Sequence, residues 1–186
     1  MRPLLKSLRI LTIAVIALHG CAPFKPAEPV TTVDSVDLTR YMGTWYEIAR
    51  LPAWFQRHCV DSKAVYTMRD DGSIGVHNEC VTAAGDVDRA DGTAKVVDPV
   101  TNAKLSVTFG SWFARLFEST PTGNYWILSI DSEYQTAMVG TPDRQYLWIL
   151  SRSPHIDPTT YEFLLDYARE LGFPLSELIR DQRASS

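Results

Sequence analysis

Two cysteines and two histidines are the residues of this 186-residue chain whose types and spacing could carry chemistry. Cys59 and Cys80 flank a segment that alternates like a β-hairpin, so their side chains are expected to come close in space. His58 and His77 belong to the same segment, and the four side chains are of the types that bind zinc. The spacing lacks the tight Cys-x-x-Cys or His-x-x-x-His pair of a typical zinc site. Two alternatives stand at this point: a disulfide, or a metal site shared with the histidines.

Other catalytic constellations are missing from the sequence. The chain has no Gly-x-Ser-x-Gly turn, no phosphate-binding loop and no His-Glu-x-x-His pair. We therefore predict that the protein is not an enzyme and uses no cofactor.

Residues 1–20 have the order of a secretory signal. Three basic residues and no acidic one precede the apolar run 10–18, and small or polar residues follow it. The alternative, a transmembrane anchor, is disfavoured because nine residues are too few to span a bilayer, which takes about 20. We expect residues 1–20 to be a signal peptide that is removed.

The segment from Leu18 to Cys21, Leu-His-Gly-Cys, resembles the bacterial lipoprotein box. The resemblance implies cleavage before Cys21 and lipid on its sulfur and amine, which together anchor a protein stably. Because Ala22 follows and not Asp, the resemblance also implies sorting to the outer membrane, on its periplasmic face. Residues 21–36 are then the lipidated N-terminus and a proline-containing tether.

The charge balance sets limits on the partners. The formal net charge is −4, and without residues 1–20 the count becomes 15 basic against 22 acidic residues, or −7. Such an acidic surface argues against a general nucleic-acid binder. It also repels anionic lipid headgroups, so membrane contact is expected through the lipid anchor alone.

An exported chain folds in an oxidising compartment, and lipid attachment uses Cys21. Cys59 and Cys80 then remain as a pair, so the sequence favours the disulfide, without a metal, over the zinc site. Ideal pairing around the turn at 70–72 does not place them directly opposite each other, so a bulge or loop must adjust the geometry. Closing a loop of about twenty residues contributes ~3 kcal/mol to stability.

Eight short runs with the alternation and residue types of β-strands follow, with turn signals between them. An amphipathic helix is predicted over 157–173, with Asp157 as its cap, Pro158 in its first turn and Gly172 at its exit. The segment 174–182 fits either a last helical turn or a short edge strand. The pattern allows a β-sandwich or a barrel. The strands are expected at 44–51, 60–69, 73–80, 86–98, 103–109, 125–130, 135–140 and 145–152.

Three motifs in order resemble those of the lipocalin family, including its bacterial outer-membrane lipoprotein members. Residues 38–52 resemble the first motif, with its Gly-x-Trp core, and residues 131–154 cover the second and third. The resemblance extends over residues 33–182. It implies an all-β protein: an eight-stranded antiparallel up-and-down β-barrel with a C-terminal α-helix. The motif positions with a structural role are Gly43, Trp45, Asp131, Tyr134 and Arg152.

The resemblance also sets the domain limits and the two ends of the barrel. The lipocalin domain is expected at 37–182, with a short tail at 183–186. In an up-and-down barrel the connections alternate between the ends, so all three motifs meet at one end. There Arg152 is expected to stack on Trp45 and close the barrel, a contact worth up to about 2 kcal/mol.

Strand parity from Arg152 predicts that Leu150, Trp148 and Tyr146 face a ligand cavity, the alternative being a dry core. Alternation places Leu105, Val107 and Phe109 on the inner face of their own strand, and Phe113 belongs to an aromatic loop. Arg57 and Arg115 near the open end are candidates for contact with a phosphate or carboxylate. The predicted ligand-binding residues are Trp148, Tyr146, Leu150, Leu105, Val107, Phe109, Tyr125, Tyr66 and Phe113.

The resemblance to the bacterial lipoprotein members of the family implies a function for this chain. It suggests binding, storage or transport of a fatty acid or lysophospholipid, in envelope maintenance or stress. Alternatives are another apolar ligand such as haem, a pigment or a siderophore, a scaffold without a ligand, or a lipocalin-type isomerase with Cys59 as nucleophile. Pairing of Cys59 with Cys80 would make that nucleophile inert.

Overall fold

The structure is a computed structural model that describes residues 28–110 and 121–181. The predicted signal peptide 1–20, Cys21, Phe113, Arg115 and the tail 183–186 lie outside the described residues.

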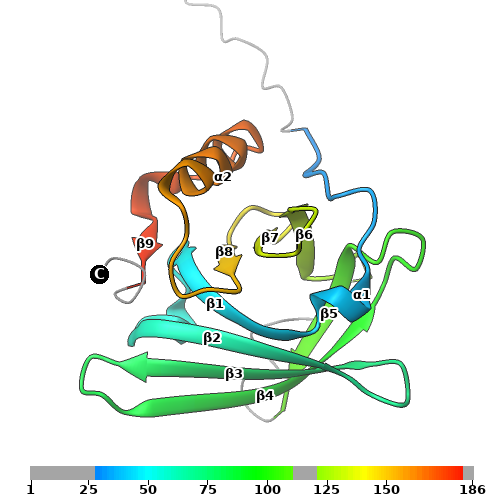
Figure 1. The fold of residues 1–186 in the computed structure, drawn as a ribbon, viewed down its shortest axis with the longest axis horizontal. Coiled ribbons are helices and arrows are strands. Elements are labelled where there is room, and N and C mark those ends of the chain that lie inside the picture. The colour runs from blue at the N-terminus through cyan, green and yellow to red at the C-terminus, as the bar shows by residue number, and fades with distance from the viewer. Residues whose placement is uncertain (1–27, 111–120, 182–186) are drawn as a thin grey trace, which may run out of the picture.

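Eight antiparallel strands close into a barrel, which confirms the predicted fold and decides against the sandwich (Figure 1). Each strand pairs with its neighbour in sequence, and β1 pairs with both β2 and β8, which completes the circle. Closure removes the exposed edges that an open sheet would present. The strands are β1 (Gly43–Arg50), β2 (Cys59–Met68), β3 (Ile74–Thr82), β4 (Val87–Val96), β5 (Lys104–Phe109), β6 (Tyr125–Ile130), β7 (Thr136–Gly140) and β8 (Leu147–Ser151).

The two halves of the barrel differ in how their outer faces are covered. Strands β7 and β8 are buried on both faces and consist almost entirely of apolar residues. Half of the residues of strand β4 are polar, and only Gly92 and Ala94 of this strand are buried. Consecutive apolar residues are typical of strands covered on both sides, whereas alternation is typical of strands with one solvated face.

Helix α2 (Pro158–Glu170) covers the apolar outer face of the barrel, above β6, β7 and β8 in Figure 1. The Asp157 side chain caps it by accepting from the Thr160 N–H, and Gly172, with φ +83°, follows its end, as predicted. Leu164 and Ala168 pack against Ile48 and other outward-facing residues of the barrel in one core cluster. No helix among the described residues combines the length and apolar character that membrane crossing requires.

The C-terminal segment is a 3-10 turn, η3 (Leu175–Glu177), followed by the short strand β9 (Ile179–Arg180). Of the two alternatives for this segment, the described part, which ends at Asp181, shows a short edge strand after a turn. On one edge of β1, strand β2 pairs as far as Tyr46 and β9 takes its place from Ala49 onward. The end of the chain therefore fills the gap where β1 and β2 separate.

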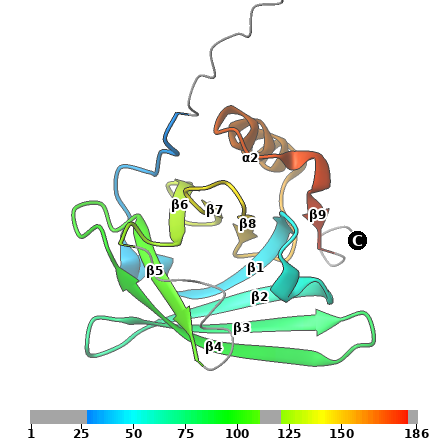
Figure 2. The same cartoon turned by 180° about the vertical axis from the view of Figure 1, so that it is seen from behind.

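The N-terminal part of the described chain packs on the barrel (Figure 2). Val30 and Val36 are buried, and the N–H of Val36 donates to the Thr101 carbonyl at 2.7 Å. Residues 28–36, which the sequence assigns to a tether, thus belong to the folded unit. They lead into α1 (Leu38–Tyr41), a turn of helix that the strand pattern does not predict and that Asp37 caps.

Candidate ligand-binding cavity

A cavity of about 430 Å³ lies inside the barrel. It is lined by residues of β1 to β6 and β8 and by the 3-10 turn η1 (Trp54–Gln56), which follows β1. Its size is within the range of small-molecule sites in proteins. Slightly more than half of its lining residues are apolar or aromatic, among them Val76, Val107 and Phe109, and the others are polar or charged.

One end of the barrel is closed by Arg152 and Trp45. The guanidinium carbon lies 3.9 Å from the centroid of the Trp45 ring, and Trp45 is fully buried. The Trp45 Nε1–H donates to the Tyr41 carbonyl at 2.8 Å. Neither residue lines the cavity. Arg152 donates to the carbonyl oxygens of Tyr134 (3.2 Å), Thr44 (2.8 Å), Arg40 (2.7 Å) and Met42 (2.8 Å).

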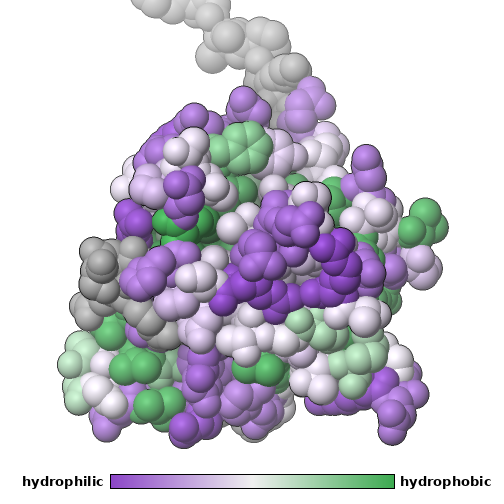
Figure 3. Space-filling view, viewed as in Figure 1, coloured by the Kyte–Doolittle hydropathy of each residue, from purple (hydrophilic) through white to green (hydrophobic). Residues whose placement is uncertain are grey.

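The other motif residues support this closed end. Gly43 has φ +99°, and a Cβ there would lie 3.3 Å from Arg152 Nη1, so a side chain would be strained. Tyr134, with φ +57°, accepts the Asp37 N–H on its hydroxyl at 2.8 Å. On the surface, hydrophilic residues gather between β8 and α1 (Figure 3). This end of the barrel is polar and held together by hydrogen bonds, so it is not a route for an apolar ligand.

Asp131 organises the β6–β7 turn at the same end. Its carboxylate accepts the backbone N–H groups of Glu133 and Gln135, each at 2.9 Å, and the N–H and hydroxyl of Thr136. Burial by itself would raise the pKa of this carboxyl. The hydrogen bonds, led by those from Thr136, outweigh the effect of burial and lower the pKa below its usual value. Asp131 therefore remains charged and holds the turn.

A cluster of three tyrosine hydroxyls lies between the closed end and the cavity. The Tyr125 hydroxyl bonds to those of Tyr41 at 2.7 Å and Tyr66 at 2.9 Å, and Tyr66 and Tyr125 line the cavity. Burial raises the pKa of all three, that of Tyr66 to about 12. The hydroxyls are therefore neutral at physiological pH and satisfy one another.

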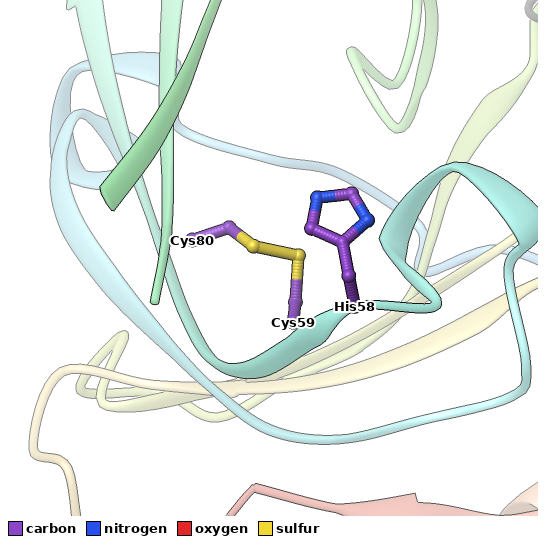
Figure 4. A group of neighbouring side chains, drawn as sticks. All are labelled: His58, Cys59 and Cys80. Carbon is purple, nitrogen blue, oxygen red and sulfur yellow. A yellow bond between two sulfur atoms is a disulfide. The ribbon is translucent and has the colours of Figure 1, made fainter. Parts of the chain in front are cut away.

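Cys59 and Cys80 form a disulfide at the cavity wall, as Figure 4 shows. Their Cα atoms are 5.5 Å apart, and the β2–β3 register shifts between Cys59 and Asp61, which is the bulge that the sequence required. The predicted disulfide is confirmed. His58 lies beside the sulfurs, with its ring nitrogen 2.9 Å from Asp88 Oδ2, whereas His77 contacts Asp91 instead. Sulfurs in a disulfide offer no thiolate to zinc or to a substrate.

A buried ionic cluster connects the cavity wall to the C-terminal strand. Arg50 Nη1 lies 2.7 Å from Glu47 Oε1 and 3.4 Å from Asp181 Oδ1, and all three side chains are almost fully buried. Asp181 Oδ2 accepts the Ser62 N–H at 2.9 Å, so this carboxyl joins β2 to the chain end. Burial raises the pKa of Glu47, and burial followed by the charge of Glu47 raises the pKa of Asp181 to about 8.

Most of the predicted ligand-binding residues lie at the cavity, and two do not. Leu105 packs in the barrel core towards the closed end, because β5 begins there. Tyr146 precedes β8, so strand parity does not extend to it, and it stacks on Trp148 with ring centroids 5.9 Å apart. The predicted residues that line the cavity are Trp148, Leu150, Val107, Phe109, Tyr125 and Tyr66.

Polar residues of the wall were missed at the sequence level. Ser62 and Asn78 line the cavity from the inner faces of β2 and β3, as Tyr66 and Val76 do at the same parity. Gln56 joins the wall by accepting from the Trp148 indole at 3.0 Å and donating to Glu47 at 3.0 Å. Alternation along β2 could have predicted that Ser62 faces inward. Which strand and which residues lie beside it is known only from the β2–β3 register.

Comparisons with known proteins agree with this architecture. The Lipocalin-like domain family model matches residues 36–183. Temperature-induced lipocalin-1 of Arabidopsis thaliana is 42% identical over 154 residues, 81% of each chain. Outer membrane lipoprotein Blc of Escherichia coli (strain K12) is 36% identical over 174 residues, 93% of this chain and 94% of that one. The solved structure of insecticyanin from the tobacco hornworm Manduca sexta superposes with a TM-score of 0.58 at 20% identity, over 82% and 84% of the chains.

Proposed function

The chain belongs to the lipocalin family, and on this premise we propose that it binds the acyl chain of a fatty acid or lysophospholipid inside its barrel. The observation that carries the proposal is the cavity of about 430 Å³, closed at one end by Arg152 and Trp45 and lined mainly by apolar groups. A cup with one closed and one open end suits a long apolar ligand that enters from one side.

The energy of binding comes from burial of methylene groups. Twelve methylenes at about 0.8 kcal/mol each contribute roughly 10 kcal/mol before the costs of ordering and association. Trp148, Leu150, Val107 and Phe109 supply apolar contact area in the wall. Phe113, outside the described residues, remains a proposed contact at the mouth.

We propose the outer membrane as the place of action. The relative from Escherichia coli is named an outer membrane lipoprotein, and this chain has the expected signal at 1–20 and Cys21 for lipid attachment. The anchor would hold the barrel at the periplasmic face, where it would store or shuttle acyl lipids during envelope maintenance or stress. The disulfide leaves Cys59 without a thiol, which supports a carrier and not an isomerase.

Identification of the bound molecule tests the proposal directly. Native mass spectrometry of the purified mature protein, followed by extraction, should give the mass of a fatty acid or lysophospholipid. Haem, a pigment or a siderophore in the extract would replace the proposal with another cargo. A barrel that refuses every acyl ligand would leave only a scaffold.

A filled cavity tests where the ligand lies. Ala64 lines the cavity on β2, and Thr67 is an exposed residue of the same strand. Ala64→Trp should lower the affinity for a fluorescent fatty acid at least about tenfold, because the acyl chain then buries less apolar surface. Thr67→Trp is the matched control and should bind like the wild type. Equal affinity of both variants would place the ligand outside the barrel.

A further inference from the structure

Asp181 holds the C-terminal strand β9 at the place where β1 and β2 separate (Figure 1). Its N–H donates to the Ile48 carbonyl of β1 at 3.0 Å, and its Oδ2 accepts the Ser62 N–H of β2 at 2.9 Å. The side chain is buried. A single residue of the C-terminal segment therefore joins both strands.

Arg50 connects Asp181 to the chain segment between β1 and β2, at the end of the barrel opposite to the closed end. Its Nη1 lies 2.7 Å from Glu47 Oε1 and 3.4 Å from Asp181 Oδ1. Its Nη2 donates to the carbonyls of Gln56 at 3.1 Å and Cys59 at 2.9 Å. Gln56, Cys59 and the two residues between them all line the cavity. The position of the guanidinium therefore determines where this part of the cavity wall lies.

The hydrogen bonds continue from Glu47 to an aromatic side chain of the wall. Gln56 Nε2 donates to Glu47 Oε2 at 3.0 Å, and Gln56 Oε1 accepts from the Trp148 indole at 3.0 Å. Glu47, Gln56 and Trp148 all line the cavity. A chain of direct polar contacts thus leads from Asp181, through Arg50, to side chains that would contact a ligand.

Two carboxyls share one guanidinium in this buried cluster. Glu47 accepts hydrogen bonds on both oxygens, from Arg50 and from Gln56, as a carboxylate does. Asp181 Oδ1 has the longer contact with Arg50. If both carboxyls were ionised, the buried cluster would carry a net negative charge, which burial disfavours. The geometry therefore assigns one shared proton to the cluster and places it on Asp181.

The charges around Asp181 agree with this assignment. Burial, followed by the charge of Glu47 on β1, raises the pKa of Asp181 to about 8, and Asp61 on β2 acts in the same direction. The Ser62 N–H and the charge of Arg50 act in the opposite direction and are outweighed. At neutral pH the folded protein therefore holds this proton.

We propose that Asp181 is a positioning residue for ligand binding, which acts through Arg50 on the segment 56–59 and on the contact between Gln56 and Trp148. The inference rests on the proposed function and adds a control to it. When Asp181 loses its proton, it competes with Glu47 for Arg50 and leaves the cluster negatively charged. An acyl chain in the cavity excludes water from Glu47, so binding favours the protonated, neutral cluster.

Linkage gives the sign of the effect on affinity. Because the filled cavity holds the proton more tightly than the empty one, binding takes up a proton wherever the empty protein has released it. Affinity for the acyl chain is therefore highest below about pH 8 and falls as the pH rises through this value.

Dodecanoyl lysophosphatidylcholine tests the proposal on the mature protein, because its phosphodiester and quaternary ammonium groups do not titrate in this pH range. The affinity of the wild type should fall about threefold to tenfold between about pH 7 and about pH 9, since one proton changes affinity at most about tenfold per pH unit. Isothermal titration near the pKa, in two buffers of different ionisation enthalpy, should show proton uptake on binding, up to about one proton per ligand.

Two substitutions of Asp181 separate positioning from stability. Asp181→Asn keeps an acceptor for the Ser62 N–H and cannot ionise, so its affinities at the two pH values should be equal and binding should take up no proton. Asp181→Ala loses this acceptor and should bind the probe about fivefold more weakly than Asp181→Asn at neutral pH. If β9 had a structural role alone, Asp181→Ala would melt earlier and its folded fraction would bind normally.

Asp166→Asn is the matched control. Asp166 is an exposed carboxyl of α2 that contacts Arg169, and it does not line the cavity. Its variant should keep both the fall in affinity and the proton uptake of the wild type.

Two results would overturn the positioning role. One is a wild-type affinity that does not change between the two pH values. The other is a fall that persists unchanged in Asp181→Asn, and this variant decides the question even if Asp181→Ala does not fold. In both cases the probe still binds and the proposed function stands. If neither the probe nor dodecanoic acid binds the wild type at any pH, the proposed function fails and the positioning role fails with it.

Discussion

The Arg152 guanidinium stacks on the Trp45 indole at 3.9 Å while its N–H groups donate to four backbone carbonyls. One side chain from the end of β8 thereby joins the start of β1, the α1 turn and the β6–β7 turn. Its planar fork of donors suits this task, which a lysine could not perform with one ammonium group. The contact closes the barrel at the end opposite to the proposed entry.

Trp45→Ala should lower the free energy of unfolding by ~3–5 kcal/mol, since a fully buried large side chain is lost. Because Trp45 does not line the cavity, the affinity of the folded fraction for acyl ligands should change little. Denaturant unfolding and a ligand titration measure the two effects. A variant that keeps its stability and loses its ligand would contradict the structural role.

Removal of the disulfide should destabilise the protein. The bond links residues separated by 21 positions, and the loss of such a closed loop costs ~3 kcal/mol. The Cys59→Ser, Cys80→Ser double variant should therefore unfold at lower denaturant than the wild type. Addition of a reductant to the wild type should reproduce the shift and leave the double variant unaffected. Equal unfolding midpoints of both proteins without reductant would show that the bond contributes nothing.

The tyrosine cluster predicts an order of effects for two similar substitutions. Tyr125→Phe removes the shared partner and leaves the buried hydroxyls of Tyr41 and Tyr66 unpaired, at about 1–3 kcal/mol each. Tyr66→Phe removes one bond and keeps the bond between Tyr41 and Tyr125, so it should cost only about 1 kcal/mol. Denaturant unfolding of the two variants should rank Tyr125→Phe as the less stable. The reverse order would mean that the hydroxyls have other partners.

Stability should fall as the pH rises from about 4 to about 8 through Asp181. In this window the folded protein holds a proton on Asp181 that the unfolded chain, with a pKa near its usual range, has released. Raising the pH therefore favours the unfolded state, and Glu47, whose pKa burial also raises, acts in the same direction. Asp181→Asn keeps an acceptor for the Ser62 N–H and should flatten the dependence of the melting temperature on pH.

His77 supplies the control for that experiment. The hydrogen bond to Asp91 raises its pKa, so its contribution is also lost as the pH rises, starting near the usual histidine pKa. The ring is solvent-accessible, so screening keeps its effect small. His77→Gln should leave most of the pH dependence in place. A steep dependence that survives Asp181→Asn and disappears in His77→Gln would assign it to the histidine.

Much of the fold could be predicted because its signals are local. Alternation of residue types marks each strand, and Asp157, Pro158 and Gly172 mark the ends of α2. The α1 turn was missed because four residues are too few for a periodic pattern. Leu105 and Tyr146 were wrongly placed at the cavity. Their positions depend on where their strands begin relative to the cavity, and strand parity gives no information on that.

By itself the sequence predicted the faces of most strands and, through its resemblance to a family, the closed barrel, and it favoured the disulfide, since motifs and alternation depend on near neighbours. The tertiary structure decided which polar groups find partners. Asp181 reaches Ser62 across 119 positions and Arg50 across 131, so the ionic cluster exists only once β9 has paired with β1. Likewise, Ser62 and Asn78 reach the cavity wall only because the β2–β3 register places both on the inner face of the barrel. Hydrogen-bond satisfaction depends on position in space, and contacts between distant segments set that position.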